Sequence, residues 1–367
     1  MKFSIQREQL LKPLQTIVGV VERRQTLPVL SNVLVSVKDG SLSMTTTDLE
    51  VEMIATVSID AAEEGDITIP ARKFVDICRA LPEGAMLNIS QDPEKERVTV
   101  RSGKSRFNLS TLPATDFPNV EEAAVQFSFS VPQQVIKQAI EKTSFAMAQQ
   151  DVRYYLNGLL LEVSAGYLSA VATDGHRLAL CKKEADIQPV DVIQIIVPRK
   201  GVMELVKLVE DEGSVEVQLG TNHIKIRFDD YVFTSKLIDG KFPDYQRVIP
   251  RNSDKKITAD REHLRQAFVR TSILSNEKYR GIRFRLSPGL LQAQANNPEM
   301  EEAEEEIEVD YQGSELEIGF NVSYLVDALS AVSDDTVTME LGDPNSSCVI
   351  RGTEDPSCTY VIMPMRL

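Results

Sequence analysis

One motif that occurs three times in the chain constrains the fold more than any other feature. Each copy reads as a short apolar strand, a polar start, an amphipathic helix and an acidic or glycine-rich stop. The copies cover residues 67–84, 195–213 and 316–335. Equivalent places in them are 128 positions (70 to 198) and 123 positions (198 to 321) apart. A period of that length indicates repeated domains and not the units of a solenoid.

A second series of strand and helix patterns recurs in the same order and supports the repeat. Its copies cover residues 2–20, 127–140 and 256–268, and each is followed by segments with strand character. Each third of the chain thus holds two strand–helix–strand units. We therefore predict three repeated domains, at residues 1–125, 126–253 and 254–367.

Composition narrows the class of protein. The chain has 367 residues, of which 42% are hydrophobic and 26% charged, as in soluble globular proteins. No apolar run approaches the roughly 20 residues that span a bilayer, and the first residues carry charges where a signal peptide needs an apolar core. We expect a cytoplasmic protein. The four cysteines show no metal-ligand spacing; Cys78 and Cys181 have apolar neighbours, so we expect core thiols and no structural disulfide.

The distribution of charge is more informative than its sum. A net charge of −15 argues against electrostatic nucleic-acid binding over the whole surface. Basic residues nevertheless gather on five of the six repeated helices, which could be a solvated outer face or a binding surface. They are Arg7, Lys12, Arg72, Lys73, Arg79, Lys137, Lys142, Arg199, Lys200, Lys207, Arg261, Arg265 and Arg270. The sixth helix lacks them.

Two loops carry side chains that suit nucleic acid. Arg23 and Arg24 follow the first helix, where arginine could bind phosphate or be merely solvated. The equivalent loop of the second repeat holds Arg153 beside Tyr154 and Tyr155. These could stack on bases or bind phosphate, or the tyrosines could begin a strand with one ring inward. The residues leave these alternatives open.

Asp174 lies two residues before His176, and an Asp and a His so close in sequence could be part of a catalytic site. However, Asp-Gly between apolar runs is a strong hairpin signal, and no Ser or Cys stands in a nucleophile elbow. A hydrolase or transferase that uses Asp174 and His176 is therefore only the alternative function. No Walker loop, dinucleotide fingerprint, HExxH motif or zinc-ligand spacing favours an enzyme.

Three further segments allow two interpretations. A hairpin over 97–110 has basic outward positions, and residues 299–308 form a dense acidic run. The acidic run could be a solvated strand or could meet the basic hairpin of another copy. The apolar ending, residues 360–367, could be a last strand or could line an adaptable groove for partner peptides.

Taken together, the motifs resemble one family from residue 2 to residue 367: the bacterial sliding clamp, the beta subunit of replicative DNA polymerase III. The most specific stretches are Gln150-Asp-Val-Arg-Tyr-Tyr-Leu-Asn-Gly, Ala172-Thr-Asp-Gly-His-Arg-Leu, Lys241-Phe-Pro-Asp-Tyr, Ile273-Leu-Ser-Asn-Glu-Lys, Ile318-Gly-Phe-Asn-Val-Ser-Tyr and Met363-Pro-Met-Arg-Leu. The resemblance implies an α+β fold of three DNA-clamp domains, with helices lining a central hole and antiparallel sheets outside. It implies that two chains close head to tail into a dimeric ring.

The resemblance also implies a function. A sliding clamp encircles duplex DNA without reading its sequence and tethers the polymerase for processive replication, with no catalytic activity, cofactor or metal of its own. Its partners would be a second copy, the polymerase III catalytic subunit, the clamp-loader complex, other DNA polymerases and mismatch-repair proteins. Because the sixth helix lacks basic residues, the third domain would contact DNA little.

Three sets of site residues follow from the resemblance. DNA contacts carry over onto Arg24, Gln150, Arg153, Tyr154 and Tyr155. The ring interface carries over onto Lys104, Arg106, Phe107 and Leu109 on one side, and onto Ile273, Leu274, Glu299, Glu301, Glu302, Glu304 and Glu305 on the other. The pocket for partner peptides carries over onto Leu156, Thr173, Gly175, His176, Arg177, Leu178, Pro243, Arg247, Val248, Asn321, Tyr324, Ser347, Val361, Met363, Pro364, Met365, Arg366 and Leu367.

Overall fold

The computed structural model describes residues 1–22, 27–60, 62–92, 96–118, 124–251 and 253–366. The chain forms two compact units, one of Met1–Gln133 with Met203–Leu237 and one of Gln134–Val202 with Ile238–Leu367. None of the helices in the described part of the chain combines the length and the apolar character that a membrane crossing requires.

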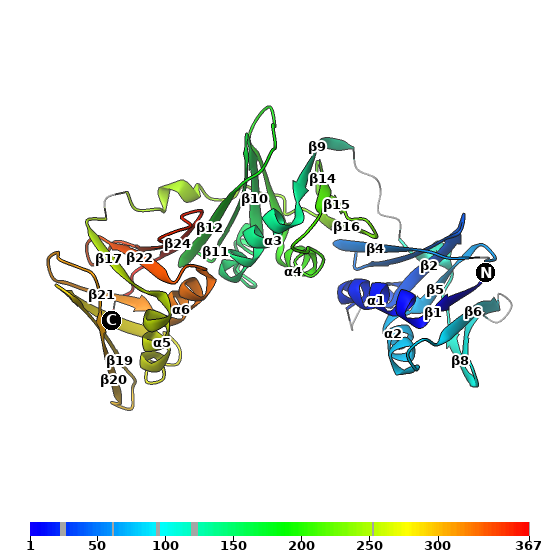
Figure 1. Cartoon of the computed structure of the whole chain (residues 1–367), viewed down its shortest axis with the longest axis horizontal. Coiled ribbons are helices and arrows are strands. Elements are labelled where there is room, and N and C mark those ends of the chain that lie inside the picture. Colours follow the sequence, from blue (N-terminus) through cyan, green and yellow to red (C-terminus); the bar gives the residue numbers. More distant parts are fainter. Residues whose placement is uncertain (23–26, 61, 93–95, 119–123, 252, 367) are drawn as a thin grey trace. The chain divides into compact units, whose positions relative to one another are not determined.

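The first unit contains two antiparallel sheets (Figure 1). The smaller sheet has the order β1 (Lys2–Gln6), β6 (Met86–Asp92), β7 (Arg97–Ser102) and β8 (Ser105–Ser110). The larger sheet has the order β5 (Gly65–Pro70), β2 (Asn32–Lys38), β3 (Ser41–Thr47), β4 (Val51–Ser58), β16 (Tyr231–Lys236), β15 (His223–Arg227), β14 (Ser214–Gly220) and β9 (Val125–Pro132). Buried and more exposed residues alternate along β3, as expected for a sheet with one face on the core.

The second unit repeats this pair of sheets. Its larger sheet has the order β13 (Ile193–Pro198), β10 (Gly158–Ser164), β11 (Tyr167–Thr173), β12 (Arg177–Glu184), β24 (Cys358–Ile362), β23 (Cys348–Gly352), β22 (Thr336–Leu341) and β17 (Lys255–Asp260). Its smaller sheet has the order β20 (Glu302–Glu308), β19 (Leu290–Asn296), β18 (Gly281–Ser287) and β21 (Leu316–Asn321).

The large sheets continue across the predicted domain boundaries. In the first unit β4 pairs with β16, which lies about 180 positions later in the chain. In the second unit β12 pairs with β24 in the same antiparallel manner. Each large sheet thus combines strands from two of the predicted repeats.

Within the described residues, six α-helices follow the six predicted strand–helix patterns. They are α1 (Arg7–Ile17), α2 (Ala71–Ala80), α3 (Gln133–Glu141), α4 (Arg199–Leu205), α5 (Arg261–Ser272) and α6 (Val322–Ala331). The apolar face of α2 buries Phe74, Val75 and Cys78. Asp260 caps α5 by accepting a hydrogen bond from the His263 amide. Helix α4 ends at Leu205, although the apolar pattern continues to Val209. Beyond Leu205 the backbone forms turns, in which the Lys207 amide donates to the Glu204 carbonyl and the Leu208 amide to the Leu205 carbonyl.

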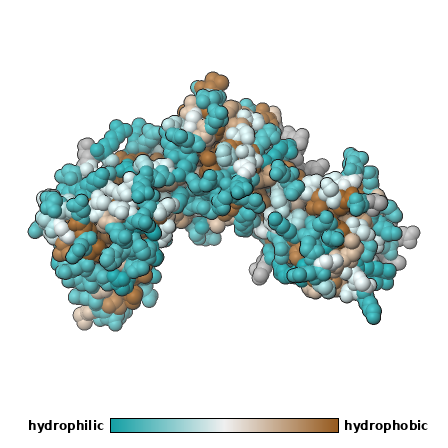
Figure 2. All heavy atoms as spheres, viewed as in Figure 1, coloured by the Kyte–Doolittle hydropathy of each residue, from teal (hydrophilic) through white to brown (hydrophobic). Residues whose placement is uncertain are grey.

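Hydrophilic side chains cover most of the face shown in Figure 2, where the apolar patches are small and separate. Large apolar side chains with high exposure include Val190 (100%), Val152 (95%), Met300 (89%) and Ile273 (72%). Scattered exposure of this kind is normal, and only a patch or an interface gives it meaning.

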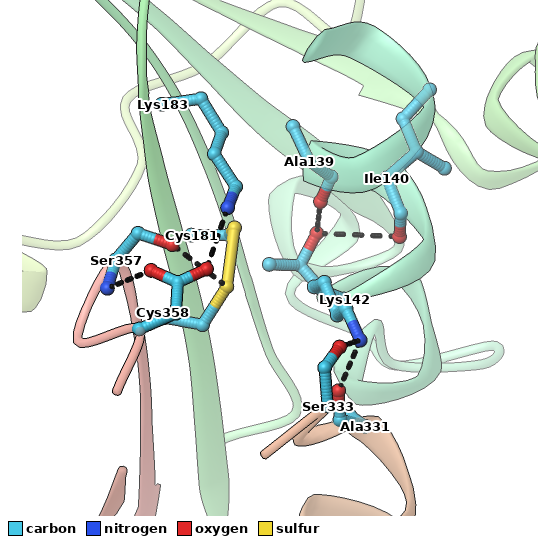
Figure 3. The surroundings of a disulfide bond; sticks show 11 residues. Ala139, Ile140, Lys142, Cys181, Lys183, Ala331, Ser333, Ser357 and Cys358 are labelled. Carbon is cyan, nitrogen blue, oxygen red and sulfur yellow. Dashed lines mark hydrogen bonds and ion pairs between the residues drawn. A yellow bond between two sulfur atoms is a disulfide. The ribbon is translucent and has the colours of Figure 1, made fainter. Parts of the chain in front are cut away.

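The structure corrects one expectation about the cysteines. Cys181 and Cys358 form a disulfide that joins β12 to β24 (Figure 3). Cys78 and Cys348 are buried free thiols. The two bonded residues are 177 positions apart, so their spacing carried no signal. They meet because the register of β12 against β24 places them opposite each other.

Glu52, where β4 meets β16, makes the stability of the first unit depend on pH. It lies opposite Thr234, and burial raises its pKa to about 7, although the charge of Lys225 opposes the shift. The folded state thus favours the protonated acid. Its contribution is fully present below pH 4.5, the unfolded value, and is lost as the pH rises through about 7.

We therefore expect Glu52→Gln to stabilise the first unit at pH 8 by at most about 3 kcal/mol and to change little at pH 4. Urea unfolding at both pH values measures this difference. Glu216→Gln, which removes an exposed carboxylate from β14 of the same sheet, is the control. Equal unfolding free energies of wild type and Glu52→Gln at pH 8 would contradict the expectation.

Candidate functional site

An apolar pocket opens on the second unit and encloses about 190 Å³. Its lining comes from four segments far apart in the sequence: the 3-10 turn η6 (Tyr154–Leu156) with the preceding arginine, the β11–β12 turn, residues 243–248 and the end of β24. The lining residues are Arg153, Tyr155, Leu156, Thr173, Gly175, Arg177, Leu178, Pro243, Tyr245, Val248, Val361 and Met363. Leu156, Leu178 and Val361 belong to a buried apolar cluster, so the floor of the pocket is part of the core. An apolar pocket with a few polar groups at its rim suits a small ligand or an apolar peptide side chain.

The β11–β12 turn owes its shape to three consecutive residues. The Thr173 hydroxyl donates to the Arg177 carbonyl (2.6 Å) and accepts from the Gly175 amide (3.1 Å). The Asp174 carboxylate accepts from the backbone amides of His176 (2.9 Å) and Arg177 (3.0 Å). Gly175 adopts φ +88°, which side-chain-bearing residues rarely do. Asp174 therefore shapes the turn, and its bonds to His176 go to the backbone and not to the ring.

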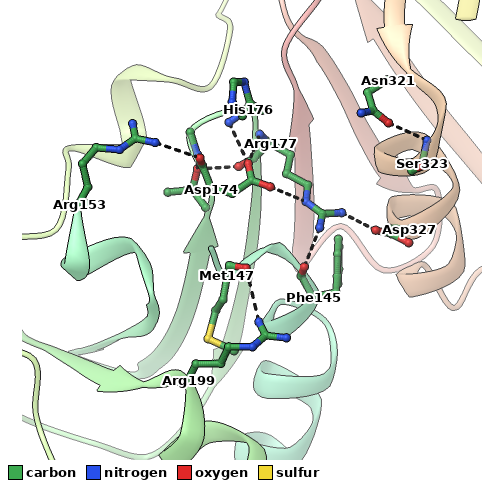
Figure 4. Close-up of polar contacts among 12 residues, drawn as sticks. Phe145, Met147, Arg153, Asp174, His176, Arg177, Arg199, Asn321, Ser323 and Asp327 are labelled. Carbon is green, nitrogen blue, oxygen red and sulfur yellow. Dashed lines mark hydrogen bonds and ion pairs between the residues drawn. The ribbon is translucent and has the colours of Figure 1, made fainter. Parts of the chain in front are cut away.

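Arg177 holds the pocket wall against two other segments (Figure 4). Its Nε donates to Asp174 (3.1 Å), one terminal nitrogen donates to the Phe145 carbonyl (2.8 Å), and the other donates to Asp327 of α6. The guanidinium also lies over the Tyr324 ring (4.5 Å) and the Phe145 ring (5.3 Å). Because the Arg177 side chain is only 14% exposed, this charge depends on its fixed partners and not on water.

Arg153 forms another part of the rim. Its guanidinium donates to both carboxylate oxygens of Asp151 (3.0 and 2.9 Å), which lowers the pKa of Asp151 to about 2. It also donates to the Asp174 carbonyl (3.2 Å). A β-carbon added at Gly175 would lie 2.9 Å from this guanidinium, so only glycine allows Arg153 to pack against the turn.

The two tyrosines of this loop have different surroundings. Tyr154 is 58% exposed, whereas Tyr155 packs against the apolar cluster below the pocket. Their rings are 5.9 Å apart in an edge-on arrangement. The alternation of one ring outward and one inward occurs on a 3-10 turn and not at the start of a strand.

Three family models describe the chain almost from end to end. The N-terminal, central and C-terminal domains of the DNA polymerase III beta subunit match residues 1–121, 130–244 and 246–366. The chain belongs to the DNA polymerase III beta subunit family. Its three-domain clamp fold is therefore established, and the beta subunit is a processivity factor and not a catalytic enzyme.

Relatives of the beta subunit family match over their whole length. The beta sliding clamps of Pseudomonas aeruginosa and Escherichia coli (strain K12) are 58% and 52% identical to this chain, with full coverage of both sequences. A crystal structure of the sliding clamp from Pseudomonas aeruginosa with ligand has a TM-score of 0.98 at 57% identity and full coverage of both chains. The polymerase III beta structure of Caulobacter crescentus has a TM-score of 0.94 at 39% identity, also with full coverage.

The pocket brings together nine of the residues expected from the beta subunit family to bind peptides. They are Leu156, Thr173, Gly175, Arg177, Leu178, Pro243, Val248, Val361 and Met363. The lining also includes Arg153, Tyr155 and Tyr245, which the sequence interpretation did not assign to it. The pocket forms only when its four chain segments pack together, so no local pattern marks these three residues as part of it.

The other expected pocket residues lie outside this lining. Tyr324 stacks on Arg177, and Asn321 caps α6 by accepting from the Ser323 amide (2.9 Å). The Met365 amide donates to the Gly319 carbonyl, and the His176 carbonyl accepts from the Met363 amide. Arg247 is 85% exposed and pairs with Asp244. Ser347 and Pro364 are partly buried, Arg366 is exposed, and Leu367 lies outside the described residues.

Arg24, an expected DNA contact, also lies outside the described residues. Gln150 is exposed and adopts φ +55° at the start of the loop that carries Arg153. The four described DNA-contact candidates, Gln150, Arg153, Tyr154 and Tyr155, are close in sequence and lie on this one loop.

Several basic residues of the helices have structural tasks that the charge pattern did not reveal. Arg7, the first residue of α1, donates to the Cys78 and Arg79 carbonyls at the end of α2. Arg261, the first residue of α5, likewise donates to the Leu329 carbonyl in the last turn of α6 and to the Asp334 carbonyl just beyond that helix. Further bonds to backbone carbonyls come from Arg72 to Val21, from Lys142 to Ala331 and from Arg199 to Met147. The basic bias on the helices thus has a partly structural origin.

Each unit ends a small sheet in an edge strand of pronounced charge. In the first unit the edge strand is β8, with exposed Arg106 and neighbouring Lys104. Phe107 and Leu109 on the same strand are partly buried. An open edge offers unpaired amide and carbonyl groups to another strand.

In the second unit the edge strand is β20, where Glu302 and Glu304 are exposed. Glu299 and Glu301 precede it and are also exposed, and the neighbouring Ile273 is 72% exposed while Leu274 is partly buried. Glu305 is bound within its own chain by Arg270 through two bonds (2.7 and 2.9 Å), and this pairing lowers its pKa.

Proposed function

We propose that two copies of this chain close head to tail into a ring that encircles duplex DNA and tethers the replicative polymerase. Family membership, with relatives above 50% identity along the whole chain, carries this proposal. Domain borders at residues 125/126 and 253/254 and a cytoplasmic location belong to the same proposal.

Ring closure would use the two edge strands. The basic β8 with Lys104, Arg106, Phe107 and Leu109 would pair with the acidic β20 of another copy, with its glutamates and the apolar Ile273 and Leu274. Opposite charges guide the approach, and the apolar side chains supply buried area. An interface between two different patches gives a closed two-chain ring only if it relates one copy to the next by a half turn; any rotation that does not close gives an open filament.

The pocket on the second unit would bind partner peptides. An extended peptide that presents a glutamine and apolar side chains would insert the apolar ones above Leu178 and Val361. The polymerase III catalytic subunit, the clamp-loader complex, other DNA polymerases and mismatch-repair proteins would compete for this pocket. Duplex DNA would be contacted through Arg24, Gln150, Arg153, Tyr154 and Tyr155 without sequence preference.

The experiment that tests a ring is retention on DNA of different topology. The protein is loaded onto a nicked circular plasmid by the clamp-loader complex with ATP, and bound protein is separated by gel filtration before and after a restriction cut. We expect retention on the circle and loss of most of the protein on the linear DNA, because an encircling ring slides off an end. Retention that survives the cut would mean that ordinary contacts hold the protein and would overturn the proposal.

A further inference from the structure

Cys181 and Cys358 face each other across the two strands that carry the pocket. We propose that they form a reversible redox site, at which peroxide closes a disulfide between β12 and β24 and cellular thiols reopen it. The inference concerns a covalent modification and goes beyond the proposed DNA clamp. Disulfides in a reducing compartment are mostly transient and redox-sensing, which fits a bond that opens and closes.

The register of the sheet brings the two sulfur atoms together. Cys181 pairs with Cys358, and the Lys182 amide donates to the Ser357 carbonyl (2.9 Å). This bond makes Cys181 and Cys358 a non-hydrogen-bonded pair, the type in which facing side chains lie closest. Their Cα atoms are 4.1 Å apart. Since backbone bonds fix this pairing, the two thiols remain neighbours when the disulfide is open.

The surroundings give one of the two sulfurs a route to a small oxidant. Cys358 is 9% exposed and lines a cavity of about 20 Å³, whereas Cys181 is fully buried. A cavity of that size holds one molecule as small as water. Tyr360 also lines it, and its buried hydroxyl has no hydrogen-bond partner within the described residues. Cys358 is therefore the residue that peroxide reaches first.

Charged groups also lie around the pair (Figure 3). Lys183 binds Asp355 (3.0 Å), and Lys142 donates to the Ala331 carbonyl and the Ser333 hydroxyl. Ammonium groups near a thiol favour the reactive thiolate, whereas the Asp334 and Asp355 carboxylates, which line the same cavity as Lys142 and Cys358, oppose it. The other two cysteines are fully buried free thiols, and the charge of the nearby Arg7 only partly offsets the burial of Cys78. Burial raises the pKa of Cys78 to about 12 and also raises that of Cys348, so both are expected to stay thiols.

The chemistry balances with hydrogen peroxide as the oxidant. The Cys358 thiolate attacks one peroxide oxygen, the O–O bond breaks, and a sulfenic acid forms while the released hydroxide takes up the thiol proton as water. The Cys181 sulfur then attacks the sulfenic sulfur, the S–O bond breaks, and a second water leaves. Two thiols are oxidised and one peroxide is reduced. A thiol reductant reverses the bond by exchange.

The bond acts on the strand that supplies one side of the pocket. Three pairs further along the same ladder, Leu178 faces Val361, and both line the pocket. The disulfide closes a loop with a sequence separation of 177, and long loops give the largest restriction of the unfolded chain. We therefore expect oxidation to hold β24 more firmly on β12 and to slow the opening of this part of the second unit.

Thiol counting tests the site directly. The full chain is treated with hydrogen peroxide or with dithiothreitol, denatured, tagged with a maleimide and weighed by mass spectrometry. We expect two tags after peroxide, at Cys78 and Cys348, and four after dithiothreitol. Four tags after peroxide, or loss of the tag at Cys78 or Cys348, would overturn the proposal.

Calorimetry and hydrogen exchange test the consequence. We expect the oxidised protein to melt at least about 5 °C higher than the reduced one and its Tyr360–Met363 amides to exchange more slowly. Cys358→Ser should abolish both differences, and Cys78→Ala should keep them. Identical melting temperatures of the oxidised and reduced wild-type protein would contradict the proposed stabilisation by the Cys181–Cys358 disulfide. No DNA or peptide enters these measurements, so their failure is separate from failure of the proposed clamp function.

Discussion

Replacement of Arg177 by methionine is expected to lower the free energy of unfolding of the second unit by about 3–5 kcal/mol. The substitution keeps much of the side-chain length but leaves Asp174, Asp327 and the Phe145 carbonyl without their shared donor. Urea unfolding followed by circular dichroism measures the loss, since the chain has no tryptophan to report it.

The same substitution should weaken partner-peptide binding by at least about tenfold. Arg177 lines the pocket and supports Tyr324, so its loss releases one wall of the pocket from α6. Fluorescence polarisation with a labelled peptide that carries a glutamine and apolar residues measures this affinity at a temperature where both proteins are folded.

Arg247→Met is the matched control. Arg247 was also expected at the pocket, but its side chain is 85% exposed and pairs only with the nearby Asp244 among the described residues. An exposed pair of this kind contributes about 0–1 kcal/mol, so stability should hardly change. If Arg177→Met were as stable as Arg247→Met, the three-way anchoring of Arg177 would not matter.

Replacement of Ile273 by aspartate is expected to turn the dimer into monomers and to raise the dissociation constant at least about 1000-fold. In the single chain this side chain is 72% exposed, so the carboxylate costs the monomer little. In the proposed interface it would be buried beside β20, where the neighbouring glutamates add repulsion. Sedimentation equilibrium measures the association.

Val190→Asp provides the control for this second experiment. Val190 is fully exposed on the loop between β12 and β13, away from both edge strands in sequence. The variant should stay dimeric, and both variants should melt near the wild-type temperature when measured at monomeric concentrations. A dimeric Ile273→Asp protein would remove Ile273 from the proposed interface, and loss of the dimer in Val190→Asp would show an unspecific effect of charge.

The positions of the six helices and the hairpin at the pocket followed from local patterns. Apolar spacing along a helix and alternation along a strand reflect which side chains reach the core, and both are properties of neighbouring residues. Asp174 and Gly175 predicted the turn because its shape depends only on the backbone conformation of these neighbouring residues, and Gly175 adopts the positive φ that the turn needs. The catalytic alternative for Asp174 is wrong because the chain belongs to a family of non-catalytic processivity factors. The Asp174 carboxylate instead accepts bonds within the turn.

The sequence by itself determined the threefold repeat, the strand–helix order and the charged edge segments, because each depends on contacts within a few residues. The tertiary structure decided which residues meet across the sheets. Arg177 binds Asp327, which lies 150 positions later in the chain, and Cys181 bonds to Cys358, which lies 177 positions later. Arg7 donates to a backbone carbonyl at the end of α2. Arg153, expected on DNA, also forms the rim of the pocket. These pairings depend on strand register and helix packing, and no periodicity within the chain encodes which distant residue will lie opposite.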